Sequence, residues 1–473
     1  MNTNIRRSDA LDALRGLAIL FMVLSGSIHF PNHLPAWMYH AQVPPPNFKF
    51  NPDLPGITWV DLVFPFFLFA MGAAFPFGLT KKIESGTAQW KIILQIFQRG
   101  LLLVGFAIFV QHTKPFLFSE NPTMVDWILG LCAFVILFTI LVRFPEHIKK
   151  TYRYILKSVA WVCAIILLAA LRFPDETSFS LTRSDIIIIV LANVAVFGSF
   201  IWMYTKNNIL LRIGILGFLI ALRLTQNIEG SWNQWFWNFS PFPWMYKLYY
   251  LQYLFIVIPG TVAGDLIYQW MHTKENESNT SKQFSNSILL TLLLLMIMVV
   301  FVNVVGLYSR FILTTISIDF LLILSAFLLI KKASNNTEIL YKKLFNWGVY
   351  WLVLGLCFEA YEGGIKKDHP TLSYYFITTA LAIFTYIAFS ILTVDFKKSR
   401  YVNLLIENGK NPMIAYVAGN IVVLPILSIT SLTTLLNTMT VYPWLGFVKG
   451  VLFTTLVALV TSYFTKKNLF WRT

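Results

Sequence analysis

Histidine and aspartate side chains cluster around the end of the first apolar stretch of the chain. His29, His33 and His40 lie within twelve residues, and Asp61 opens the next apolar stretch in GITWVDLVFPFFLFAMG. Histidine has an ordinary pKa of about 6.5, which suits proton transfer or nucleophilic attack near neutral pH. A neighbouring carboxylate would orient the imidazole and support its charge. These residues therefore predict a site for acid–base or covalent chemistry.

Two other interpretations of the cluster are a metal site and a plain interfacial loop. Histidine and aspartate are zinc ligands, but the spacing here fits no zinc motif, so no metal is expected. The three cysteines, Cys132, Cys163 and Cys357, all fall inside apolar runs. They predict neither a disulfide framework nor a metal site.

A second set of polar residues suits an anion. Asp12 and Arg15 are three residues apart and can pair on one helix face. In ENGKNPMIAY, Asn411 is expected to N-cap a helix that begins at Pro412. A helix N-terminus beside Lys410 would bind an anion, such as a phosphate. An ion pair at the start of a helix and a simple capped helix are the structural alternatives.

The elements that position these residues must be membrane helices. Of the 473 residues, 57% are apolar and only 12% are charged, against about 25% charged in soluble domains. That composition excludes an ordinary cytosolic enzyme, a disordered chain and a nucleic-acid-binding domain. The net charge of +15 is better explained by basic cytoplasmic loops than by a nucleic-acid partner. We predict an all-α, polytopic integral membrane protein.

A membrane span needs about 20 apolar residues, and the chain offers about fourteen candidates, with an expected range of 12–14. The stretch near Leu216 is the shortest. The approximate centres are Leu20, Leu68, Leu102, Ala133, Ile165, Val194, Leu216, Val257, Leu295, Ile323, Leu354, Leu381, Gly419 and Phe453.

The distribution of basic residues orients these helices. With both termini in the cytoplasm, most of the 37 lysines and arginines fall on the cytoplasmic side. His40, Asp61 and the tryptophan-rich range 231–246 are then external. Arg15 would lie about 20 Å from Asp61 by helix rise, so a histidine is the expected partner of Asp61.

The chain is expected to form a single membrane domain. A polar cytoplasmic loop, near Thr273 to Ser285, separates possible halves at 1–272 and 286–473. No internal repeat supports that division.

Several motifs resemble the heparan-α-glucosaminide N-acetyltransferase family and its bacterial relatives among transmembrane acyltransferases. They are DALRGLAILFMVL from Asp12 to Leu24, His40 in WMYHAQ, and GITWVDLVFPFFLFAMG from Gly56 to Gly72. Weaker similarities follow in family order: FQRGLLLVG around Arg99, PGTVAGD, NGKNPMIAYV and TKKNLFWRT.

The resemblance implies an enzyme that takes acetyl groups from cytosolic acetyl-CoA and delivers them to a glucosamine amine across the membrane. His40 matches the family's catalytic histidine, and Asp61 would orient it. The expected coenzyme-phosphate residues are Arg15, Arg99, Lys410 and Asn411. The expected acceptor residues are His29, His33 and Trp59. His40 would act either as a covalent acetyl carrier or as the base that deprotonates the amine.

The chain also departs from the family. Gly26, between Ser25 and Ser27, stands where lysosomal members carry an asparagine, the range 43–54 is an insertion, and the separate lumenal domain is absent. The acceptor therefore stays open among a glycan glucosamine, an amino sugar of lipopolysaccharide and a small imported sugar. The alternatives are a secondary transporter and a scaffold or flippase-like subunit. The expected partners are the amino-sugar acceptor and membrane lipid, with a homodimer left open, and the expected location is a bacterial inner membrane.

Overall fold

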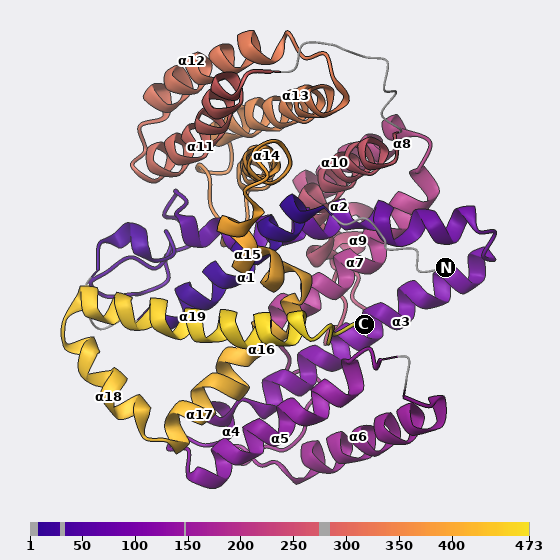
Figure 1. Ribbon diagram of the computed structural model, residues 1–473, viewed down its shortest axis with the longest axis vertical. Helices are drawn as coiled ribbons and strands as arrows, with labels where there is room; N and C mark the ends of the chain where they lie inside the picture. Colours follow the sequence, from indigo (N-terminus) through magenta and orange to yellow (C-terminus); the bar gives the residue numbers. More distant parts are fainter. Residues whose placement is uncertain (1–7, 29–33, 146–147, 274–283, 473) are drawn as a thin grey trace.

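The computed structural model describes residues 8–28, 34–145, 148–273 and 284–472, and these residues are mostly helical (Figure 1). The only β-type pairing in these ranges is one isolated antiparallel bridge between Val142 and Trp471. The predicted all-α fold is confirmed.

The helix bounds follow the apolar stretches of the sequence. Helices α1 to α10 are Asp9–Ser27, Val63–Glu84, Gln89–Thr113, Pro115–Phe118, Met124–Leu141, Lys150–Ala170, Ile186–Thr205, Ile209–Thr225, Trp232–Trp237 and Leu254–His272. Helices α11 to α19 are Asn286–Tyr308, Ile312–Ile330, Asn336–Cys357, Leu372–Ser390, Ser399–Lys410, Pro412–Ala418, Leu424–Ile429, Leu432–Thr438 and Pro443–Lys466. The 3₁₀ turns are Ala36–Met38, Trp59–Leu62, Leu248–Tyr253, Phe358–Ala360 and Met439–Val441, and the π-helical turns are Ile391–Asp395 and Gly419–Val423.

Within the described ranges, 12 helical segments are long and apolar enough to cross a membrane. The chain is a multi-pass integral membrane protein. All the predicted span centres lie in helices. Two of these helices, α8 and α13, are not among the 12 candidate spans. The helix α8 has only 17 residues, as expected for the shortest stretch, and α13 carries Glu338, Lys342 and Lys343 in its first turns.

Contacts nevertheless show that α8 runs the depth of the bundle. Arg212, near its start, pairs with Asp265 of α10 at 2.6 Å. Arg223, near its end, donates to Gln252 at 3.3 Å. Asp265 and Gln252 are thirteen residues apart, or about 20 Å of helix. The helix α8 therefore lies antiparallel to the span that contains α10 over most of its length.

The helix α13 crosses in the same way beside α14. The Tyr341 hydroxyl, in the second turn of α13, donates to Asp395 at 2.5 Å. Gly355, in the last turn, packs against Ile377 of α14. Asp395 and Ile377 are eighteen residues apart, about 27 Å along a helix. If α8 and α13 also cross the membrane, the twelve candidate spans of the described chain become the predicted fourteen.

Helix α14 lies at the centre of the bundle, and nearly all its side chains are buried. Figure 1 shows it almost end-on, with α11 and α13 on one side and α15 and α1 on the other. Helix α1 packs against α14, α15 and α19 as well as α2, so contacts join the segments before and after residue 273.

Helices α1 and α15 cross with their backbones in contact. A β-carbon added at Gly409 would overlap the carbonyl oxygen of Asp12, and one at Gly16 would overlap that of Leu405. Only glycine permits this approach. The crossing brings the DALRG and NGKNP segments, almost 400 residues apart in the chain, to one place.

Candidate functional site

The external site is built around a hydrogen bond between His40 and Asp61. Nδ1 of His40 lies 2.6 Å from Oδ1 of Asp61. The Asp61 side chain is fully buried, whereas 37% of the His40 side chain is exposed. An ionised carboxylate only accepts hydrogen bonds, so the hydrogen-bond network assigns the proton to Nδ1. Nε2 then carries the lone pair that can act as base or nucleophile.

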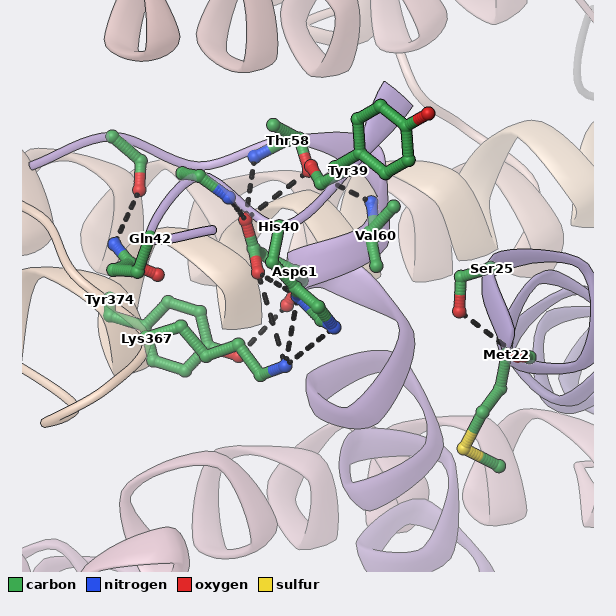
Figure 2. Close-up of polar contacts among 12 residues, drawn as sticks. Met22, Ser25, Tyr39, His40, Gln42, Thr58, Val60, Asp61, Lys367 and Tyr374 are labelled. Carbon is green, nitrogen blue, oxygen red and sulfur yellow. Dashed lines mark hydrogen bonds and ion pairs between the residues drawn. The ribbon is translucent and has the colours of Figure 1, made fainter. Parts of the chain in front are cut away.

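The local sequence fixes Asp61 at the beginning of the second span. Thr58 and Asp61 form a reciprocal capping box at the short 3₁₀ turn that leads into α2. Oδ2 of Asp61 also accepts from the backbone nitrogen of Ala41 at 3.2 Å, and the Thr58 hydroxyl donates to the carbonyl of Tyr39 at 2.7 Å. The chain on both sides of His40 is thus tied to the start of α2, as Figure 2 shows.

Lys367 joins this site from a distant part of the chain. Its Nζ lies 3.1 Å from Nδ1 and 3.4 Å from Nε2 of His40, and 4.0 Å from Oδ1 of Asp61. Because Nδ1 already donates to Asp61, the ammonium can hydrogen-bond only to Nε2. A fixed positive charge therefore stands beside the nitrogen that would do the chemistry (Figure 2).

The loop that carries Lys367 joins α13 to α14 and is anchored to other elements. The carbonyl of Ile365 accepts from the backbone nitrogen of Gly56 at 2.7 Å. Glu362 pairs with Arg223 of α8 at 2.5 Å. These contacts hold the loop against the chain that leads into Asp61, so the ammonium is positioned before any ligand arrives.

Two tyrosines pack around the dyad without competing as bases. Tyr374 of α14 is fully buried and donates its hydroxyl to the backbone carbonyl of Asp61 at 2.8 Å. Burial raises the pKa of the Tyr39 phenol, which stays neutral. His40 is the titratable group of this set that suits proton transfer near neutral pH.

Of the three predicted acceptor residues, the structure describes only Trp59. His29 and His33 lie outside the described residues. Trp59 faces α1, where its ring stands edge-on to Phe21 with centroids 5.3 Å apart, and it lines an apolar cavity. Trp59 therefore lies on the apolar side of the 3₁₀ turn that holds Asp61.

Arg15 lies closer to the external site than helix rise alone predicts. Its guanidinium hydrogen-bonds Asp12 at 2.9 Å, the carbonyl of Gly409 at 3.1 Å and that of Ala70 at 3.4 Å. Ala70 is nine residues past Asp61, about 14 Å along α2. The expected 20 Å is too large because the side chain of Arg15 extends from α1 to the middle of α2. Arg15 and Asp61 nevertheless have different partners, as expected.

Asn411 occupies the predicted N-cap position of α16, but its side chain does not cap the helix. Pro412 begins α16 as expected, but the Asn411 side chain makes no cap hydrogen bond. Its amide donates to the carbonyl of Leu469 at 2.9 Å and accepts from the nitrogen of Trp471 at 3.2 Å. Both ends of the amide are thus used to hold the C-terminal segment. Neighbouring Lys410 pairs with Asp9 at 3.3 Å.

Arg99 is exposed on α3 and belongs to a group of cations. Arg15 and Lys82 both lie close enough to Arg99 for charge repulsion. Lys82 also donates to Gln95, one turn before Arg99, at 2.5 Å. Like charges held together in this way favour an anionic ligand. The structure thus brings Arg15 and Arg99 together, with Lys82 added.

A narrow apolar cavity of about 40 Å³ is lined by residues of α1, α2, α3, α7 and α16. Val63 in its wall is two residues from Asp61, and Leu103 is one turn from Arg99. Met22 and Met413 also line it.

Residues 7–267 match the family described as a domain of unknown function, DUF5009. The chain belongs to this family. No curated protein matches the chain. The DUF5009 match includes His40, Asp61 and Arg99 but ends before Lys367 and Lys410.

Sequence reasoning missed Lys367 as a functional candidate of this DUF5009 protein. It is separated from His40 by 327 residues, and no recognised motif contains it. The one available signal was the predicted topology, which places Lys366 and Lys367 on the external side with His40. Lys82 was missed in the same way beside Arg99.

Proposed function

We propose that this protein is a transmembrane acetyltransferase of a bacterial inner membrane that moves acetyl from cytosolic acetyl-CoA to the amine of a glucosamine-type sugar on the external side. The observation that carries the proposal is the buried Asp61 holding His40 with its Nε2 beside the ammonium of Lys367. A base oriented by a carboxylate next to a fixed cation is what acyl transfer to an amine requires.

In direct transfer, the acceptor amine attacks the thioester carbonyl and loses a proton to Nε2 of His40. The new C–N bond forms, the C–S bond breaks, and the coenzyme thiolate takes up the proton. The Lys367 ammonium would stabilise the oxyanion of the tetrahedral intermediate. If His40 instead carries the acetyl group, a bond from Nε2 to the acetyl carbon forms as the C–S bond breaks and the coenzyme leaves as the thiolate. The amine then attacks the acetyl carbon, the bond to Nε2 breaks, and Nε2 takes the proton of the amine and passes it to the thiolate. Labelled acetyl on the protein in the absence of acceptor would distinguish the second route.

Support for the coenzyme comes from the neighbouring cations Arg15 and Arg99. These would bind its phosphates, with the pantetheine arm directed toward His40. The distance of about 14 Å from the level of Arg15 to Asp61 suits an extended arm.

The direct test uses purified protein, labelled acetyl-CoA and a panel of amino sugars. Wild-type protein should acetylate at least one glucosamine derivative, and His40→Ala should lose at least about a hundredfold in rate. His272→Ala is the matched control, because His272 is an exposed histidine at the end of α10. Acetylation by His40→Ala at more than about a tenth of the wild-type rate would rule out this role.

A secondary transporter is the second candidate, favoured by an irregular turn inside one span. A π-helical turn at Gly419–Val423 interrupts the span Pro412–Ile429, and broken helices are common at transport sites. Uptake of a labelled amino sugar by vesicles, without acetyl-CoA, would support transport. Such uptake should survive His40→Ala if the dyad has no part in it.

A further inference from the structure

An apolar cavity lies beside the catalytic dyad and is separate from the narrow cavity. Its volume is about 460 Å³, and α1, α2, α11 and α14 enclose it. Of the side chains in its wall, only those of Trp59 and Thr385 carry a polar atom. The Thr385 hydroxyl already donates to the carbonyl of Leu381 at 2.8 Å. The wall thus offers almost nothing for a polar ligand to bond.

The cavity is long and parallel to the helices. Its wall on α11 extends from Leu293 to Val304, eleven residues or about 16 Å. At the external end, Trp59 and Leu62 of the 3₁₀ turn line it, and Asp61 lies between them in the chain. The dyad and the external end of the cavity therefore lie on opposite sides of the same 3₁₀ turn. The distance between them is about one helix diameter, roughly 10 Å.

The rim of the cavity is open to the membrane. Phe21 on α1 is 37% exposed, and Ile297 and Phe301 on α11 are 49% and 59% exposed. All three line the cavity. Because these helices are candidate membrane spans, the exposed rim lies at the depth of the lipid hydrocarbon chains. A hydrocarbon chain can reach the cavity laterally without passing through water.

The lining decides between the candidate occupants. The amides of a pantetheine arm and the hydroxyls of a sugar ring would lose their water without gaining partners here. A hydrocarbon chain loses nothing and fills the space. We propose that this cavity holds the hydrocarbon chain of a lipid-linked amino sugar whose head group is presented to His40. The inference rests on the proposed acetyltransferase function and names the class of its acceptor.

A chain-length series tests the inference with protein in nanodiscs of phosphatidylcholine and phosphatidylglycerol. The acceptors are glucosamine and its hexyl, octyl, decyl and dodecyl β-glycosides, with labelled acetyl-CoA. Each added methylene that enters the cavity should raise kcat/KM about fourfold, until the cavity is full and the increase stops. Equal kcat/KM for glucosamine and dodecyl glucosaminide would overturn the proposal, and a bound phospholipid would then be the occupant.

A pair of variants on α11 separates the cavity from partition into the membrane. Val300→Trp fills the cavity, whereas Val305→Trp places the same ring on an exposed part of the helix outside the lining. Val300→Trp should lose the chain-length dependence but keep the wild-type rate with glucosamine, and Val305→Trp should behave as wild type. The same dependence in both variants would overturn the proposal.

A binding measurement distinguishes failure of this inference from failure of the proposed function. If no amino sugar is acetylated by wild type, the acetyltransferase proposal fails. Dodecyl glucosaminide should still raise the melting temperature of wild type and of Val305→Trp more than that of Val300→Trp. Equal shifts in all three proteins would exclude the cavity as a chain-binding site.

Discussion

At the scale of single residues, the chemistry depends on which nitrogen of His40 bears the proton. The carboxylate of Asp61 sets that choice, since it accepts from Nδ1 at 2.6 Å while backbone donors occupy its other oxygen. The Thr58 capping box makes Asp61 part of the architecture as well as of the site. A loop histidine is thereby held in one orientation, with its proton on Nδ1.

Asp61→Asn should separate these two roles. The amide oxygen can still accept from the backbone, while the amide nitrogen donates to Nδ1 and moves the imidazole proton to Nε2. We expect a rate loss of at least about a hundredfold with a fall in stability of less than about 2 kcal/mol. Single-turnover assays beside a thermal melt measure both. Wild-type rates in a folded Asp61→Asn protein would show that the tautomer is irrelevant.

Lys367→Met should slow the reaction without weakening the binding of acetyl-CoA. The ammonium is the cation that would stabilise the oxyanion, and removing one such donor should lower kcat by at least about a hundredfold. Lys366→Met is the adjacent control. Single-turnover assays measure the rate, and calorimetry measures the affinity for acetyl-CoA. A folded Lys367→Met protein with the kcat of wild type would show that Lys367 takes no part in the reaction.

Arg99→Glu tests the coenzyme side of the proposal. Reversing an exposed charge beside Arg15 and Lys82 should weaken acetyl-CoA binding by at least about tenfold, or roughly 1.4 kcal/mol. The control is Arg400→Glu, an exposed arginine at the start of α15. Calorimetry on both variants gives the comparison. Equal affinity for the two proteins would remove Arg99 from the phosphate site.

At the scale of elements, the sequence predicted the helices well and their mutual contacts poorly. Apolar stretches located every span, because length and hydropathy suffice for that. The contact between Lys367 and His40 and the depth of Arg15 depend on how α1, α2 and the loop before α14 pack. No short-range pattern encodes such packing. Asn411 is the N-cap residue as predicted, but its side chain makes no capping hydrogen bond, because a tertiary contact with Leu469 uses its amide.

The crossing of α1 and α15 gives a prediction at this scale. Gly409→Ala would place a methyl group on the Asp12 carbonyl and should cost about 1–3 kcal/mol through forced separation of the helices. Gly214→Ala on α8 is the control, because nothing lies within 4 Å of the added carbon. It should be neutral or slightly stabilising. Equal melting temperatures for the two variants would show that the crossing is not tight.

At the scale of the whole molecule, loops that the basic residues assign to the same side of the membrane also contact one another. Lys206, at the end of α7, pairs with Glu84, at the end of α2, and Arg143, after α5, donates its backbone nitrogen to Phe470. All four residues belong to the side predicted to be cytoplasmic. The loop with Lys367 and the start of α2 meet on the other side. An alternation of fourteen spans, as the sequence predicts, would put His40 and Lys367 on one face.

That alternation requires α8 to cross the membrane, although it has only 17 residues. Asn207 and Trp235 are both exposed and flank α8. In a background without Cys132, Cys163 and Cys357, Asn207→Cys should resist an impermeant thiol reagent in intact cells. Trp235→Cys should react, because α8 would place it outside. Reaction of both sites, or of neither until the membrane is opened, would mean that α8 does not cross. If α13 still crosses, His40 and Lys367 could not then share a face, and the proposed site would fail with the topology; if α13 does not cross either, the parity of the spans between them is unchanged.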